Sequence, residues 1–158
     1  MFKKNLRILA IVENLAQVLA NVDEQLDQEG CPMKTRMQID IAVEELFVNI
    51  ANYAYTPETG DADILIETMN ECPIPEEGRA GMSEEDLKGK WLRVTLSDAG
   101  KPFNPLQKDD PDVSLSAQER RIGGLGIFMV KKSMDHMYYE YRDGKNHISI
   151  CKKLSSQN

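Results

Sequence analysis

The chain contains 158 residues, of which 41% are hydrophobic, and it carries a formal net charge of −7 at pH 7. This length and composition predict one soluble globular domain over residues 1–158, large enough to bury a core without disulfide or metal staples. The acidic balance argues against generic nucleic-acid binding, which needs a basic face, and no apolar run is long enough to span a bilayer.

The cysteines and the N-terminus exclude further classes. Cys31, Cys72 and Cys151 are isolated and odd in number, so they predict neither a disulfide framework nor a zinc site. With two histidines in the chain, a transition-metal site is not expected. The N-terminal apolar run is interrupted by Arg7, closed by Glu13 and followed by no small-residue cleavage site, so we expect a cytoplasmic location.

The first part of the chain predicts one strand and two helices. Residues 1–10 interleave apolar and polar side chains, as a short strand does. Apolar side chains at helical spacing predict a helix from Val12 to Gln28, which Gly30 ends. A second helix begins near Lys34 and ends at Thr56, because the residue before Pro57 is pushed away from helical geometry.

The middle of the chain predicts two strands joined by a long connection. Residues 62–69 and 91–96 set apolar side chains between polar ones, which indicates strands. Residues 70–90 are rich in Pro, Glu and Gly and too long for a tight turn, so we expect a mobile surface excursion. One helical turn is expected there, near Ser83, because a serine cap precedes three acids.

The last part predicts a polar loop, a helix and a hairpin. Residues 106–122 lack periodicity, and we expect a loop with a short helix. The helix over 125–134 has an apolar face, and strands over 137–141 and 147–154 flank a turn with hairpin chemistry. These elements favour an α+β fold over a doubly wound parallel sheet. The expected architecture is a two-layer sandwich whose mixed, mostly antiparallel sheet is covered by helices on one face.

Three polar side chains accompany the apolar face of the second helix. At about 100° per residue, Glu45, Asn49 and Asn52 form a stripe beside that face, whereas Asp40 and Glu44 point further round toward solvent. A carboxylate and an amide one turn apart can hold a metal ion or steer a nucleophile. Taken alone, the stripe favours the simpler interpretation, the shoulder of a solvated face.

A second motif follows the strand over 91–96. Asp98-Ala99-Gly100 places a carboxylate at the end of a buried strand, where it can accept a hydrogen bond from an exocyclic amine while the glycine lets a ligand approach. The alternative is an ordinary turn that begins at Asp98, with Gly100 supplying a positive φ.

A glycine-rich stretch opens the next helix. The backbone N–H groups of Gly123-Gly124-Leu125-Gly126 and the helix dipole suit phosphate, and Arg120 and Arg121 stand just before them. Alternatively the glycines form a hinge and the arginines are solvated. The stretch is neither a Walker loop nor a Rossmann fingerprint, and the His-Arg-Asp and Asp-Phe-Gly motifs of eukaryotic-type kinases are missing.

In this order the motifs resemble a known family over nearly the whole chain. Residues 45–49, 98–105 and 123–127 are similar to the N, G1 and G2 boxes of the GHKL ATPases, which share the Bergerat ATP-binding fold. Within that superfamily the chain looks most like the small bacterial anti-sigma-factor serine/threonine kinases. The run 49–55 and the ending over 135–152 also fit that group.

The resemblance implies a role for each motif. Glu45 would act as the catalytic base or orienter of the attacking hydroxyl, Asn49 would ligate the Mg²⁺ that bridges the phosphates, and Asp98 would accept from the adenine amine. A lid over residues 106–122 would close on the nucleotide. The full nucleotide-binding set that we expect is Asn49, Asn52, Asp98, Gly100, Phe103, Arg121, Gly123, Gly124, Leu125 and Gly126.

The resemblance also implies partners. Kinases of this group use ATP and Mg²⁺ to phosphorylate a STAS-type anti-sigma-factor antagonist, inhibit a sigma factor, and commonly work as homodimers. An ATP-gated binding module without phosphotransfer is the alternative, against which the retained Glu45 argues. A two-component histidine kinase is disfavoured, because the histidines, His136 and His147, lie on no N-terminal dimerisation helix.

The sequence departs from the family pattern in two places. Tyr53 stands where these kinases usually have histidine, and the insertion over 70–90 is longer than expected. The role of Asn52 is also unassigned. Tyr53, Asn52 and the insertion all lie outside the three boxes. We therefore expect them to affect partner docking more than ATP binding.

Overall fold

A single antiparallel sheet organises the protein, whose computed structural model describes residues 1–107 and 124–155. Its strands are β1 (Phe2–Leu9), β2 (Asp61–Met69), β3 (Lys90–Asp98), β4 (His136–Arg142) and β5 (Lys145–Ser155). They pair in the order β1-β2-β3-β5-β4, and every pairing between described strands is antiparallel. The expected α+β sandwich is confirmed, without the parallel pairing that a mixed sheet would add among these strands.

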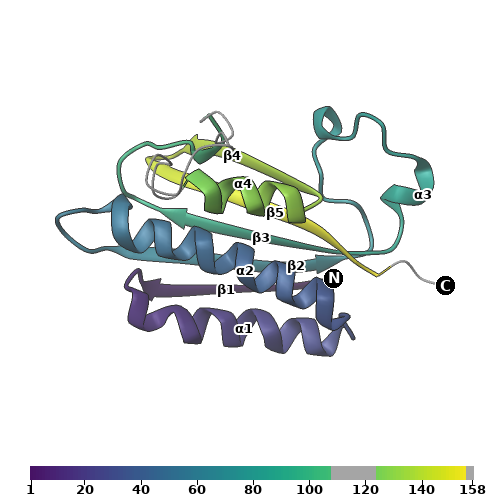
Figure 1. The fold of residues 1–158 in the computed structure, drawn as a ribbon, viewed down its shortest axis with the longest axis horizontal. Coiled ribbons are helices and arrows are strands. Elements are labelled where there is room, and N and C mark those ends of the chain that lie inside the picture. The colour runs from purple at the N-terminus through teal and green to yellow at the C-terminus, as the bar shows by residue number, and fades with distance from the viewer. Residues whose placement is uncertain (108–123, 156–158) are drawn as a thin grey trace.

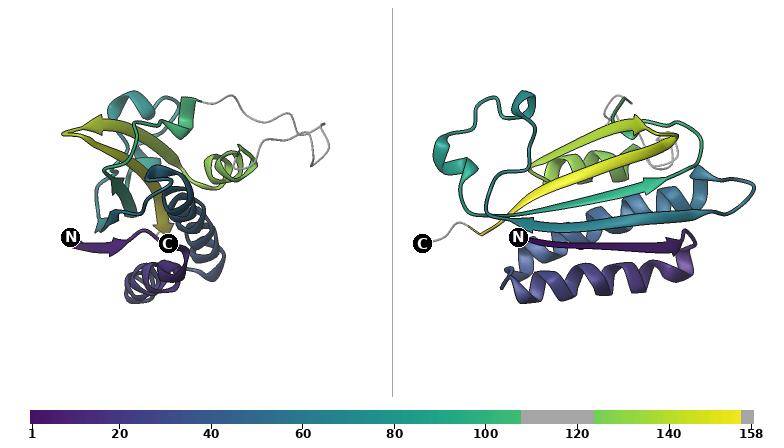
Figure 2. Two further views of the ribbon diagram at one scale, coloured as in Figure 1. Left: turned by 90° about the vertical axis from the view of Figure 1, so that its left-hand side faces the viewer. Right: turned by 180° about the vertical axis from the view of Figure 1, so that it is seen from behind.

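Three helices cover one face of the sheet, and the other face is open except at the end where the segment 70–89 packs on Trp91 and Cys151 (Figures 1 and 2). They are α1 (Leu15–Gln28), α2 (Met33–Asn49) and α4 (Gly124–Ser133). Alternation along each strand divides its side chains between the two faces: in β3, Val94 and Leu96 are fully buried under the helices, whereas Arg93 and Thr95 face the open side. Burial against the apolar faces of α1 and α2 therefore fixes which face carries the core.

The two N-terminal helices are less regular than their sequence predicts. The first begins as a 3₁₀ turn, η1 (Val12–Asn14), before α1. The second leaves α-helical geometry at Asn49 and continues as a π-helix, η2 (Ile50–Ala54). Ile50 stays buried through this change, so the apolar pattern does not reveal it.

Residues 70–89 form an arm that is anchored to the sheet, in contrast to the mobile excursion that we expected. Figure 1 shows the arm beyond one end of the strands. Ile74 packs with Trp91 and Cys151 in a second small core, and the guanidinium of Arg79 donates to the carbonyl of Ile74 at 2.7 Å. The expected helical turn is α3 (Glu84–Leu87), capped by Ser83 in a full capping box.

The closing hairpin is tighter than the turn read from the sequence. Asp143 and Gly144 alone connect β4 and β5, with φ values of 55° and 75°. Two successive positive φ values are those of a type I′ turn, which matches the twist of paired strands. Within residues 1–107 and 124–155, no helix has both the length and the apolar character needed to cross a membrane.

A carboxyl pair lies between α1 and α2, where the sequence predicted a solvent-facing Asp40. Asp40 is half-buried beside Asp23, and each has one buried oxygen without a hydrogen-bond partner among the described residues. Burial, and then Asp23, raise the pKa of Asp40 to about 7. Arg36 approaches Asp23 at 3.3 Å and Asp27 at 2.5 Å, which offsets part of this repulsion.

We expect Asp40→Asn to change how stability depends on pH. A folded-state pKa above the unfolded value means that the native state holds a proton more tightly, so its stability falls as pH rises from about 4 to 7. Removing this titration should make the variant more stable than wild type at pH 8 by about 1 kcal/mol, after allowance for solvent screening. Urea unfolding at pH 5 and pH 8 measures this difference.

Glu44→Gln on the exposed side of the same helix is the matched control. Parallel stability curves for wild type and Asp40→Asn across this pH range would contradict the proposed carboxyl pair.

Candidate functional site

Glu45, from the polar stripe on α2, contacts the glycine-rich start of α4. Glu45, on α2, is half-buried, and its carboxyl group lies against the first turn of α4. A Cβ added at Gly126 would lie 2.1 Å from the carboxyl carbon of Glu45, far inside van der Waals contact. The absence of a side chain at position 126 leaves the room that the Glu45 carboxyl group occupies, and a larger residue would displace this flexible end of the glutamate.

Glu45 and Asn49 form a polar pair on the shoulder of α2. Asn49 Nδ2 donates to Glu45 Oε1 at 3.4 Å, whereas Asn49 Oδ1 accepts no hydrogen bond from any described residue. Burial raises the pKa of Glu45; the Asn49 hydrogen bond opposes this shift and the charge of Glu44 adds to it. The pair thus offers a carboxylate with increased affinity for a proton and a neutral oxygen of the kind that Mg²⁺ prefers.

Asp98 is held rigidly at the end of β3. Its side chain is buried, and its Oδ1 accepts from Gly100 N–H and from Asn146 Nδ2, both at 2.9 Å. Its Oδ2 accepts no hydrogen bond from the part of the chain that the structure describes. One oxygen is therefore saturated and the other is available to an amine of a ligand.

Asn146 is a residue of this site that the sequence did not single out for chemistry. Its amide nitrogen donates to Asp98 and to the carbonyl of Lys101, and its oxygen accepts from Phe103 N–H and the Tyr139 hydroxyl. All hydrogen-bonding positions of the amide are thus used inside the protein. Its place beside Asp98 follows from the β3–β5 register, which was not predictable from local pattern.

The loop after Asp98 packs directly on the end of η2. A Cβ at Gly100 would lie 2.2 Å from the carbonyl oxygen of Ala54, and Lys101 N–H donates to that oxygen at 3.2 Å. Gly100 is not among the described glycines with positive φ. The space that it leaves is therefore the reason for glycine here, and the alternative of a positive-φ turn is wrong for this residue.

The other predicted residues lie at varying distances from this arrangement. Asn52 is exposed in η2, where the wider turn changes its angle from Glu45, so the regular stripe that we predicted ends at Asn49. Phe103 is 52% exposed on the loop after Asp98. Gly124 and Leu125 form the start of α4. Arg120, Arg121, Gly123 and most of the predicted lid lie outside the described residues.

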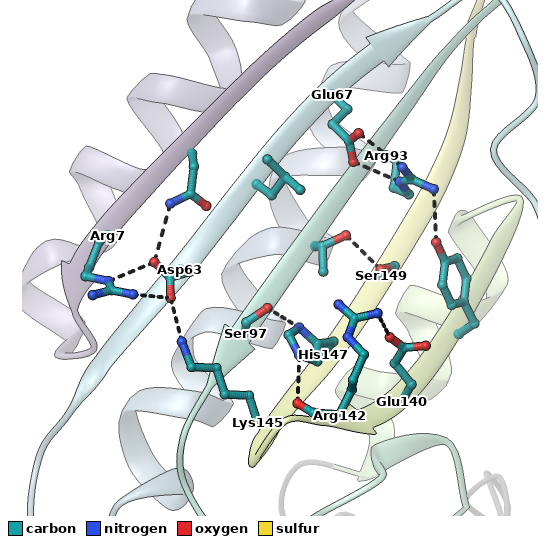
Figure 3. Close-up of a pocket in the computed structure, with 14 residues that line it drawn as sticks. Arg7, Asp63, Glu67, Arg93, Ser97, Glu140, Arg142, Lys145, His147 and Ser149 are labelled. Carbon is teal, nitrogen blue, oxygen red and sulfur yellow. Dashed lines mark hydrogen bonds and ion pairs between the residues drawn. The ribbon is translucent and has the colours of Figure 1, made fainter.

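A polar hollow lies on the open face of the sheet (Figure 3). It encloses about 530 Å³, and none of the motif residues lines it. Its charges are paired internally: Arg7 contacts Asp63 at 3.0 Å, and Arg93 contacts Glu67 at 2.9 Å. Internally paired charges are expected of a solvated sheet face and indicate no ligand site. The candidate site is therefore the arrangement of Glu45, Asn49 and Asp98 on the face under the helices.

Two comparisons with known proteins bear on this site. Residues 8–152 match a family model described as a histidine kinase-like ATPase domain. The chain is also 21% identical over 117 residues to the serine/threonine-protein kinase BtrW of Bordetella bronchiseptica, an alignment that covers 74% of this chain and 70% of that protein. Both findings agree with the resemblance that the three motifs carry.

We expect Asn146→Ala to destabilise the fold by about 2 kcal/mol, because it leaves several buried hydrogen-bonding groups unpaired. Ser97→Ala is the matched control. Ser97 precedes Asp98, is equally buried, and loses one hydrogen bond to His147 on the opposite face, so we expect about 1 kcal/mol or less. Urea denaturation measures the free energy of unfolding of both variants. An equal decrease in the two would contradict a larger contribution from the hydrogen bonds of Asn146.

Proposed function

This chain belongs to the histidine kinase-like ATPase domain family, and we propose that within it the protein is an ATP-dependent serine/threonine kinase. The observation that carries this proposal is the contact of Glu45 with Gly126. It brings a carboxylate with a raised pKa, and Asn49 beside it, to the first turn of α4, where phosphate would bind. A purely structural helix contact would not need a charged side chain there.

The adenine would be recognised by Asp98. Its Oδ2, which accepts no hydrogen bond from the described residues, would accept from the exocyclic amine, while Gly100 and Asn146 hold the other oxygen in place. A carboxylate fixed in this way needs no rearrangement to bind, which favours affinity.

The phosphates would lie at the start of α4. Gly124 and Gly126 carry no side chain that could block the backbone of the first turn, where unpaired N–H groups and the helix dipole attract anions. Asn49 Oδ1 fits a Mg²⁺ ligand, and the ion would neutralise charge on the phosphates. Glu45 would then orient the attacking hydroxyl and take up its proton.

The protein substrate would be a STAS-type anti-sigma-factor antagonist. When that antagonist is unavailable, the kinase would hold a sigma factor inactive, and it would work as a homodimer. The resemblance of the three motifs to anti-sigma-factor kinases supports this assignment, as does the similarity to a protein named serine/threonine kinase. Isothermal calorimetry with ATP and a radiolabelled-phosphate transfer assay with candidate STAS and sigma-factor proteins test it.

We expect Asp98→Asn to weaken ATP binding at least tenfold. The substituted Oδ1 must still accept from Gly100 and Asn146, so the new NH₂ group would face the adenine amine, donor against donor. Calorimetry with Mg·ATP measures the change. Asp143→Asn is the control, because position 143 is an exposed hairpin turn that also suits asparagine. Unchanged affinity in Asp98→Asn would reject Asp98 as the adenine acceptor.

We expect Glu45→Gln to retain ATP within about threefold and to lose phosphate transfer by roughly 100-fold or more, because the amide cannot act as a base. Transfer of radiolabelled phosphate to a STAS substrate is measured beside ATP affinity, with Glu44→Gln as the exposed neighbouring control. Transfer at the wild-type rate would reject the assigned base. Wild-type protein that binds ATP and never transfers phosphate would instead be an ATP-gated binding module.

A further inference from the structure

Tyr55 joins two parts of the candidate site that the sequence presents as separate motifs. It follows η2 directly, and its half-buried phenol makes two hydrogen bonds. The hydroxyl donates to the carbonyl of Asp61, at the start of β2, at 2.6 Å, and accepts from Ala99 N–H at 2.8 Å. The side chain thus connects the end of the α2 segment to the loop that carries Asp98.

The phenol is suited to this double role because it remains protonated at neutral pH. Burial raises the pKa of Tyr55; the Ala99 N–H opposes this shift, and the charges of Asp98, Asp61 and Asp63 add to it. The ring itself is closely packed: a side chain at Gly60 would meet it 2.4 Å away. The hydroxyl is therefore held in one position by packing as well as by hydrogen bonds.

A backbone contact beside Tyr55 strengthens the same junction. Lys101 N–H donates to the carbonyl of Ala54, and the absence of a side chain at Gly100 lets the two segments touch. Loop residues 99–101 are thereby fixed against residues 54 and 55. Asn49 lies six positions earlier on the same continuous helical segment, so this junction also sets the distance from Asp98 to Asn49.

We propose that Tyr55 is a positioning residue that fixes the spacing between the adenine-binding loop and the helix that carries Glu45 and Asn49. The inference rests on the proposed function, in which one nucleotide spans both parts of the site. A ligand that bridges two subsites gains affinity only when their spacing matches its own length. Tyr55 touches neither the base nor the phosphates in this arrangement; it acts through Ala99 and the helix end.

Tyr55→Phe tests the inference, because it keeps the ring packed and removes both hydrogen bonds. We expect ATP to bind about tenfold more weakly, a loss of the size that two hydrogen bonds provide. Adenosine and inorganic tripolyphosphate, which each occupy one part of the site, should bind within about twofold of wild type. Calorimetry with the three ligands measures this split, and thermal unfolding of the variant confirms that it is folded.

Tyr53→Phe is the matched control, since Tyr53 is 54% exposed in the same π-helix and should leave all three affinities unchanged. Gly60→Ala would displace the Tyr55 ring, which a Cβ there meets at 2.4 Å, without changing a residue of the predicted binding set, and it should give the same split as Tyr55→Phe. It also serves as the second variant if Tyr55→Phe does not fold.

Two results would overturn the inference alone: wild-type ATP affinity in Tyr55→Phe, or an equal loss for ATP, adenosine and tripolyphosphate. The second would show that the variant damages each subsite separately. A wild-type protein that binds no ATP would overturn the proposed function and the inference with it. The two failures are therefore distinguished by the wild-type measurement.

Discussion

The close approach of α2 and α4 at Glu45 and Gly126 is the constraint on which the site depends. Both helices bury apolar faces on the same sheet, and the absence of a side chain at Gly126 leaves room for the Glu45 carboxyl group where they meet. A glycine there lets a half-buried carboxylate stand between the helices. The same packing therefore places a carboxylate beside the first turn of α4.

Saturated hydrogen bonding explains why the other half of the site is rigid. Asn146 uses its whole amide on Asp98, Tyr139 and the loop over 101–103, and the second oxygen of Asp98 accepts no hydrogen bond from the described residues. A buried polar network of this kind is stable only when every member is paired. Asp98 Oδ2 is not among the buried unpaired side-chain atoms of the described residues, so the network contains no such exception there.

The two faces of the sheet differ: the candidate site lies on the face under the helices, and the open face is a polar surface. Asp98 and Asn146 are opposite each other on β3 and β5, and their side chains lie on the face under the helices. The neighbouring pair, Ser97 and His147, points to the open face, where the two side chains are hydrogen-bonded at 2.7 Å. The open face is hollow and polar, but its charged side chains satisfy one another (Figure 3). The arm over 70–89 closes one end of the strands through the Ile74 core, so the insertion is part of the fold.

The sequence by itself determined the elements, the fold class and the family, because hydrophobic periodicity and motif order are local properties of the chain. It also placed Glu45 and Asn49 on one helix, since their spacing is one turn. Only the tertiary structure decided that Asn146 and Tyr139 hold Asp98, that Gly100 is required for space, and that Tyr55 links the loop to the helix. These relations depend on strand register and helix packing between residues far apart in the chain, and a local pattern contains no information on either. The burial of Asp40 escaped prediction for the same reason, because it depends on the packing of α1 beside α2, and the spacing of apolar residues did not reveal the π-helix after Asn49.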